Sequence, residues 1–131
     1  MSEFIPGNLQ YAKTHEWVRV EDGEVVVGLS AYAVEQMEKE IVNVDLPQPG
    51  AKVEKGGSFG VVDSIKSAFD IYSPVSGEVT KVNSPVLEKP EIVAESPYQN
   101  GWLVRIRMNN RNDLNDLMNA AQYEEFLKSS E

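Results

Sequence analysis

The chain contains no cysteine among its 131 residues. It therefore offers no disulfide framework, no thiolate ligand for a metal and no cysteine nucleophile. Histidine is scarce as well, because His15 is the only one. One imidazole excludes a multi-histidine metal site, and no partners for a Ser-His-Asp triad are marked in the sequence. Any thiol chemistry must come from a group that the sequence does not encode.

Positive charge is also in short supply. The 12 Lys and Arg residues face 21 Asp and Glu residues, so the formal net charge is -9. Without a dense basic patch the chain lacks the counterion release that polyanion binding needs, which excludes nucleic acid and anionic membranes as expected partners. The apolar run VVVGL at 25–29 is far shorter than a membrane span, and MSEFIPGNLQ at 1–10 resembles neither a signal nor a transit peptide. The expected location is cytoplasmic.

Short runs typical of β-strands make up most of the chain. Several alternate apolar and polar residues, and turn residues such as Asp22-Gly23 and Asn100-Gly101 separate them. The runs are EWVRV at 16–20, EVVVGL at 24–29, EIVNVDL at 40–46, SFGVV at 58–62, AFDIYS at 68–73, GEVTKV at 77–82 and WLVRIRM at 102–108. This pattern predicts one mostly-β domain over residues 1–131, built as a small sandwich or barrel.

Two segments depart from the β pattern and predict helices. In SAYAVEQMEKE at 30–40, Ser30 is suited to cap a short internal helix. The second segment, at about 112–128, predicts a single C-terminal helix that packs one apolar stripe against the β core. That stripe consists of Leu114, Leu117, Met118, Ala121, Phe126 and Leu127.

Lys66 lies between two predicted strands, in a hairpin at about 58–73. Phe59, Val61, Phe69 and Ile71 occupy alternate positions, so we expect them to face the core and anchor the hairpin. A catalytic lysine needs burial or a cationic neighbour to lower its pKa, whereas this one has acidic residues on both sides and lies at a turn. The residues alone therefore favour either an inert exposed lysine or a site of covalent attachment.

The sequence around this lysine resembles a known family. SFGVVDSIKSAFDIYSPVSGEVTKVN is similar to the lipoyl-lysine segment of glycine cleavage system H proteins, and so are the flanking stretches YAKTHEWVRVEDGEVVVGLSAYAVEQM, VNVDLPQPGAKVEKG, SPYQNGWLVRIRM and LMNAAQYEEFL. Biotin carriers have Met-Lys-Met where this chain has Ile65-Lys66-Ser67. The family usually reads Glu-Ser-Val-Lys-Ala at this hairpin, and here the residues are Asp63, Ser64, Ile65, Lys66 and Ser67. Near Glu38 and Lys39 the chain carries an extra residue where the family commonly has Leu-Gly-Asp-Ile-Val.

The resemblance implies a barrel-sandwich hybrid of short antiparallel strands and a carrier that catalyses no reaction itself. Lipoate would be attached to Lys66 by a lipoate ligase or lipoyl transferase. The arm would carry the aminomethyl group of glycine between the decarboxylase, the aminomethyltransferase and dihydrolipoyl dehydrogenase. The family docks its loaded arm in a surface cleft, and the matching positions here are Thr14, His15, Glu16 and Asp70.

Other functions stay open from the sequence. An H-like lipoate-binding protein would keep the arm but carry sulfur in a heterodisulfide-reductase-like pathway. A donor that relays lipoate to other enzymes, or an unmodified interaction module, would fit the same residues. The sequence does not distinguish the cargo, the modification state, the oligomeric state or the partner-binding faces.

Overall fold

The structure is a computed structural model that describes residues 5–37 and 40–129. The predicted extra residue near Glu38 and Lys39 lies outside the described residues. In chain order the elements are β1 (Gln10–Tyr11), β2 (Glu16–Glu21), β3 (Glu24–Leu29), α1 (Ala31–Gln36), β4 (Ile41–Asp45), β5 (Lys52–Val53), β6 (Ser58–Ser64), β7 (Ala68–Tyr72), β8 (Gly77–Val82), α2 (Ser84–Glu88), α3 (Glu91–Glu95), β9 (Val104–Met108), the 3-10 helix η1 (Arg111–Asp116) and α4 (Ala120–Ser129).

The strands form two antiparallel sheets. The larger sheet has the order β1-β2-β3-β9-β8-β5, and the smaller sheet has the order β4-β6-β7. Apolar side chains fill the space between them, with Val25, Val27, Val79 and Ile106 of the larger sheet among the fully buried residues. This arrangement confirms the predicted mostly-β fold with short helices.

The predicted strands all occur, within one or two residues of their expected ends. The hairpin between β2 and β3 shows why the sequence pattern predicted these two strands and their turn. Its register pairs Glu21 with Glu24, and the two residues between them have positive φ angles, 51° at Asp22 and 78° at Gly23. Asp-Gly is well suited to that left-handed turn, which matches the twist of the two strands.

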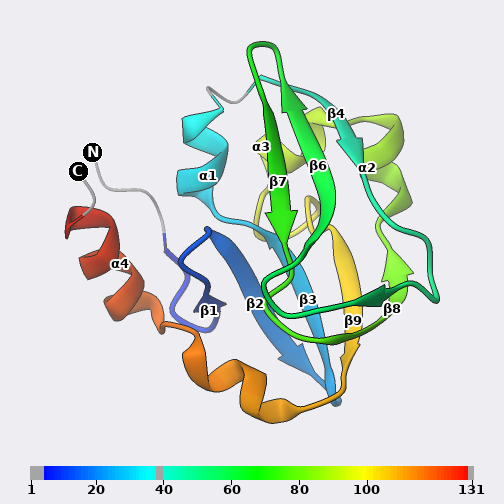
Figure 1. The fold of residues 1–131 in the computed structure, drawn as a ribbon. Coiled ribbons are helices and arrows are strands. Elements are labelled where there is room, and N and C mark those ends of the chain that lie inside the picture. The colour runs from blue at the N-terminus through cyan, green and yellow to red at the C-terminus, as the bar shows by residue number, and fades with distance from the viewer. Residues whose placement is uncertain (1–4, 38–39, 130–131) are drawn as a thin grey trace.

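The internal helix is confirmed as α1. The Ser30 hydroxyl accepts a hydrogen bond from the Ala33 amide at 3.2 Å, as expected for an N-cap. Ala33, Val34 and Met37 are buried. Through these buried side chains the helix packs against the smaller sheet, next to the β6–β7 hairpin in Figure 1.

The prediction of one continuous helix over 112–128 is wrong. Residues 111–116 form η1, Leu117 is extended, Met118 pairs with Tyr11 as an isolated β-bridge, and α4 begins only at Ala120. A side-chain cap explains the late start, because Asn119 Oδ1 accepts from the Gln122 amide at 2.8 Å and Gln122 Oε1 accepts from the Asn119 amide at 2.9 Å. The apolar stripe is divided accordingly between two hydrophobic clusters, and Ala121 is exposed.

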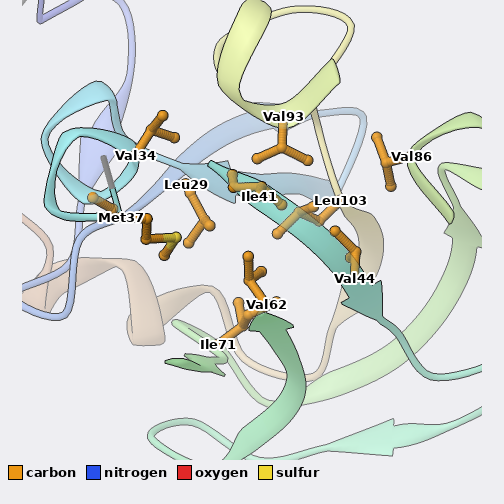
Figure 2. Close-up of a cluster of buried hydrophobic side chains, with 11 residues drawn as sticks. Leu29, Val34, Met37, Ile41, Val44, Val62, Ile71, Val86, Val93 and Leu103 are labelled. Atoms are coloured by element: carbon orange, nitrogen blue, oxygen red, sulfur yellow. The ribbon is translucent and has the colours of Figure 1, made fainter. Parts of the chain in front are cut away.

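Two short helices, α2 and α3, were not predicted. Each has five residues, which is too short for a helical repeat of apolar positions to emerge from the sequence. Their buried residues Val86 and Val93 join Leu29, Val62 and Ile71 in one cluster (Figure 2). No helix within the described residues is both long and apolar enough to cross a bilayer.

Candidate functional site

The β6–β7 hairpin holds Lys66 away from the core. Val62 and Ile71 are fully buried, one on each strand, and they anchor the base of the hairpin. The expected inward position of Val61 is wrong: a bulge between Ser58 and Gly60 shifts the alternation by one residue, so that Val62 faces the core. Phe69 packs partly buried against the same cluster. The hairpin is thus fixed at its base and projects beyond the rest of the sheet (Figure 1).

Two serines close the tip of the hairpin. The Ser64 amide donates to the Ser67 carbonyl at 2.8 Å, and the Ser67 amide donates to the Ser64 hydroxyl at 3.2 Å. The side chain thereby replaces a backbone carbonyl in closing the turn. Ile65 is 64% exposed and Lys66 is exposed beside it. Both side chains at the centre of the turn therefore face solvent and are accessible to another protein.

A cleft of about 280 Å³ opens along the hairpin. Its lining includes all four residues that the family resemblance selected, Thr14, His15, Glu16 and Asp70. The remaining lining residues come from the end of β3, from α1 with its flanking Met37, and from Phe69 of β7: Leu29, Tyr32, Ala33, Gln36 and Met37, with Phe69. Asp70 lies four residues from Lys66 in sequence and is the third residue of β7.

Glu16 is the buried carboxylate of this cleft, with only 1% of its surface exposed. Thr14 donates its hydroxyl to Oε1, and the amide of Tyr72 donates to Oε2 at 3.0 Å. Burial raises the pKa of Glu16 to about 7, although both hydrogen bonds act in the opposite direction. The carboxyl group therefore changes charge near neutral pH.

Asp70 is the exposed carboxylate of the cleft. It lies opposite Val61 in the hairpin register and accepts a hydrogen bond from the Ser58 hydroxyl at 3.1 Å. Asp63 lies closer to the tip and accepts a longer hydrogen bond, 3.3 Å, from the Asn43 side chain of β4. The cleft therefore combines one buried and one exposed acid.

His15 occupies the turn that leads into β2, with a φ of 78°. This left-handed conformation is uncommon outside glycine, although histidine adopts it more readily than most residues. Its Nδ1 lies 2.8 Å from the Tyr123 hydroxyl, and its ring centre lies 4.7 Å from that of Tyr32. Burial lowers the pKa of His15, so the neutral imidazole is favoured.

The residues of the site that sequence reasoning missed include three tyrosines. Tyr32 lines the cleft, Tyr72 donates to Glu16 through its amide, and Tyr123 bonds to His15. Tyr123 is separated from His15 by 108 positions. No local pattern marks such a contact, because it depends on how the C-terminal helix docks.

Comparison with known proteins gives a consistent result. A profile of the family described as Glycine cleavage H-protein matches residues 9–130. The Glycine cleavage system H protein of Synechococcus sp. (strain JA-3-3Ab) is 48% identical over 125 residues, or 95% of this chain and 96% of that protein. The protein of the same name from Marinobacter nauticus is 43% identical over the full length of both chains. The crystal structure of a glycine cleavage system H protein from Mycobacterium marinum has a TM-score of 0.85 at 32% identity, covering 96% of this chain and 98% of that chain.

Two antiparallel sheets with a lysine at the tip of an exposed hairpin define the lipoyl-domain-like class of carrier proteins. Within that class, the chain belongs to the glycine cleavage H-protein family. It is thus a carrier subunit of the glycine cleavage system, as the resemblance predicted. The relatives compared are named for glycine cleavage, so the sulfur-carrying and lipoate-relay alternatives are not favoured.

Proposed function

We propose that Lys66 carries lipoate and that the chain shuttles the aminomethyl group of glycine, without catalysing a step itself. The observation that carries this proposal is the position of an exposed lysine at a hairpin tip beside an acidic cleft of about 280 Å³. When bound, the dithiolane of lipoate supplies the sulfur that accepts the cargo. The absence of cysteine suits such a group, because no thiol of the chain can trap it in a mixed disulfide.

In this proposal the hairpin presents Lys66 to the enzyme that attaches lipoate. Lys66 would be joined to lipoate through an amide, which removes its positive charge and leaves a flexible stem. Ser64 and Ser67 hold the turn in shape, and Ile65 offers an exposed apolar side chain to the modifying enzyme. Asp63, next to Ser64, keeps the acidic character of the attachment segment.

In this proposal the cleft protects the aminomethyl group, which is cationic when its amine is protonated. The aminomethyl group carries an amine, and a carboxylate binds an ammonium group through a charge-assisted hydrogen bond. Asp70 would meet the cargo at the mouth of the cleft and Glu16 inside it. A cation next to Glu16 favours its ionised form, so binding would lower the raised pKa of that carboxyl group. Thr14 and His15 would complete the wall that excludes water.

The partners follow from this role. The decarboxylase would load the arm, the aminomethyltransferase would unload it, and dihydrolipoyl dehydrogenase would reoxidise it. A lipoate ligase or lipoyl transferase would attach the arm, and the cytoplasm is the proposed location. No role for nucleic acid or a membrane is proposed, in line with the net charge of -9.

Intact-mass spectrometry of protein produced with lipoate tests the attachment site. We expect one lipoyl adduct in the wild type and in Lys81→Ala, which changes another exposed lysine in β8. Lys66→Ala should lack the adduct. An adduct that survives this substitution would refute Lys66 as the site, and a wild type without any adduct would refute the cofactor. Glycine–bicarbonate exchange with the decarboxylase then tests the cargo.

Release of the aminomethyl group from loaded protein tests the cleft. Loss of one charge-assisted hydrogen bond is worth about 1.5–3 kcal/mol, so Glu16→Gln and Asp70→Asn should each speed release by roughly tenfold or more. Asp45→Asn changes an exposed acid in β4 that does not line the cleft and should leave release unchanged. Equal rates in all four proteins would count against arm docking.

A further inference from the structure

Tyr123 contacts two of the segments that line the cleft without lining it itself. It lies in α4 and is fully buried. Its hydroxyl lies 2.8 Å from His15 Nδ1 and 2.8 Å from Ser30 Oγ. Both partners are more than 90 positions away in sequence. One hydroxyl thus joins α4 to the turn before β2 and to the start of α1.

The two partners belong to different segments that build the cleft. His15 lines the cleft directly, whereas Ser30 caps α1, which supplies Tyr32, Ala33 and Gln36 to its lining. The Ser30 amide also donates to the His15 carbonyl at 2.9 Å. Backbone and side-chain contacts therefore connect the same two positions, and Tyr123 supplies the side-chain connection.

The hydroxyl constrains His15 through its single proton. A Tyr hydroxyl has one O–H to donate and lone pairs to accept. If it donates to Ser30, then His15 must donate from Nδ1; if it donates to His15, then Nδ1 must be unprotonated. In either arrangement the hydroxyl sets the tautomer and the plane of a neutral imidazole that already favours the uncharged form.

The ring of Tyr123 is held independently of its hydroxyl. It stacks on Tyr11 with ring centres 4.5 Å apart and planes within 2° of parallel. Tyr11 donates its own hydroxyl to the Pro6 carbonyl at 2.6 Å, away from the cleft. Removing either hydroxyl leaves both rings stacked, which provides a matched pair of substitutions.

We propose that Tyr123 is a positioning residue, which fixes the His15 ring and the first turn of α1 and thereby sets the shape of the cleft. Its effect on the loaded arm rests on the proposed function; its effect on His15 and α1 does not. A merely structural tyrosine would contribute through the buried ring alone, and its hydroxyl could be removed without consequence for the cleft.

NMR of the unlipoylated protein provides the first test. His15 is the only histidine, so its ring nitrogen signals are assigned without ambiguity. Tyr123→Phe should shift the Nδ1 resonance and the His15 titration midpoint, and should speed hydrogen exchange of the Ala33 amide, which Ser30 caps. Tyr11→Phe should leave all three as in the wild type. Unchanged His15 signals in Tyr123→Phe, or equal shifts in both variants, would overturn the proposal.

The lipoylated protein provides the second test. Release of the aminomethyl group should be several-fold faster in Tyr123→Phe than in Tyr11→Phe and the wild type. Equal release rates, together with altered His15 signals, would overturn the link between Tyr123 and arm protection. If the wild type itself releases its cargo as fast as free lipoyl-lysine does, the proposed cleft function fails, and the His15 signals still decide the positioning role.

Discussion

Replacing Glu16 with Gln should make the stability of the fold less sensitive to pH. Glu16 is buried, and its pKa is raised to about 7 from an ordinary value of 4.5. The folded state therefore favours the protonated form. The stability that this preference provides is fully present below the unfolded pKa, near 4.5, and is lost as pH rises through about 7. Glutamine lacks this titration but retains the shape of the side chain.

The size of the effect follows from the same pKa values. A pKa of about 7 against 4.5 corresponds to about 3 kcal/mol, since each unit is worth about 1.4 kcal/mol. Between about pH 5 and about pH 8.5, most of this amount is lost. The glutamine oxygen can accept from the Tyr72 amide while its NH₂ group donates to Thr14, so both contacts of the carboxylate have replacements.

Urea unfolding of both proteins at these two pH values measures the difference. Relative to the wild type, Glu16→Gln should gain about 2–3 kcal/mol of stability between the lower and the higher pH. Glu21→Gln is a control, because hydrogen bonds from Arg19 and Arg105 lower the pKa of Glu21. The stability that Glu21 contributes is present above its unfolded pKa and is lost only as pH falls below that value, so this variant should show almost no change relative to the wild type between the two pH values. A flat or inverted difference curve for Glu16→Gln would refute the reasoning.

Two further predictions concern the scaffold. Gly77→Ala should lower the unfolding free energy by about 1–3 kcal/mol, because the added methyl would lie 2.1 Å from the Arg107 carbonyl of the paired strand; Gly7→Ala has no atom within 4 Å to meet and should be close to neutral. Asn119→Ala should cost about 1 kcal/mol, because it removes the side-chain cap of α4, and faster hydrogen exchange of the Gln122 amide, which donates to Asn119 Oδ1, would locate the loss. An unchanged exchange rate would contradict the assignment of the cap.

The seven longer strands and α1 were predictable because their causes are local, whereas the two-residue strands β1 and β5 were not predicted. The left-handed turn at Asp22-Gly23, the alternation in EVVVGL and the cap at Ser30 each act within a few residues, and all three appear as expected. The C-terminal segment was not predictable in the same way. Its apolar residues have helical spacing, but Met118 pairs with Tyr11 and the cap at Asn119 restarts the chain as α4. A long-range strand pairing overrode the local periodicity there.

The candidate site also has some features that the sequence predicted and others that depend on the fold. Lys66 was selected from its sequence context and stays a prediction as the attachment residue; its exposed position at the tip follows from the turn around it. The family resemblance selected Thr14, His15, Glu16 and Asp70, and the fold brings these four to one cleft. The raised pKa of Glu16 could not be read from the sequence, because it depends on burial against β7.

The sequence by itself determined the seven longer strands, the capped internal helix, the family and the position of Lys66, because each depends on short-range patterns or on a contiguous motif. Only the tertiary structure decided how deeply Glu16 is buried, that Val62 and not Val61 anchors the hairpin, and that Tyr123 contacts His15. These features depend on which distant segments pack together, and burial, charge state and side-chain contacts are properties of that packing.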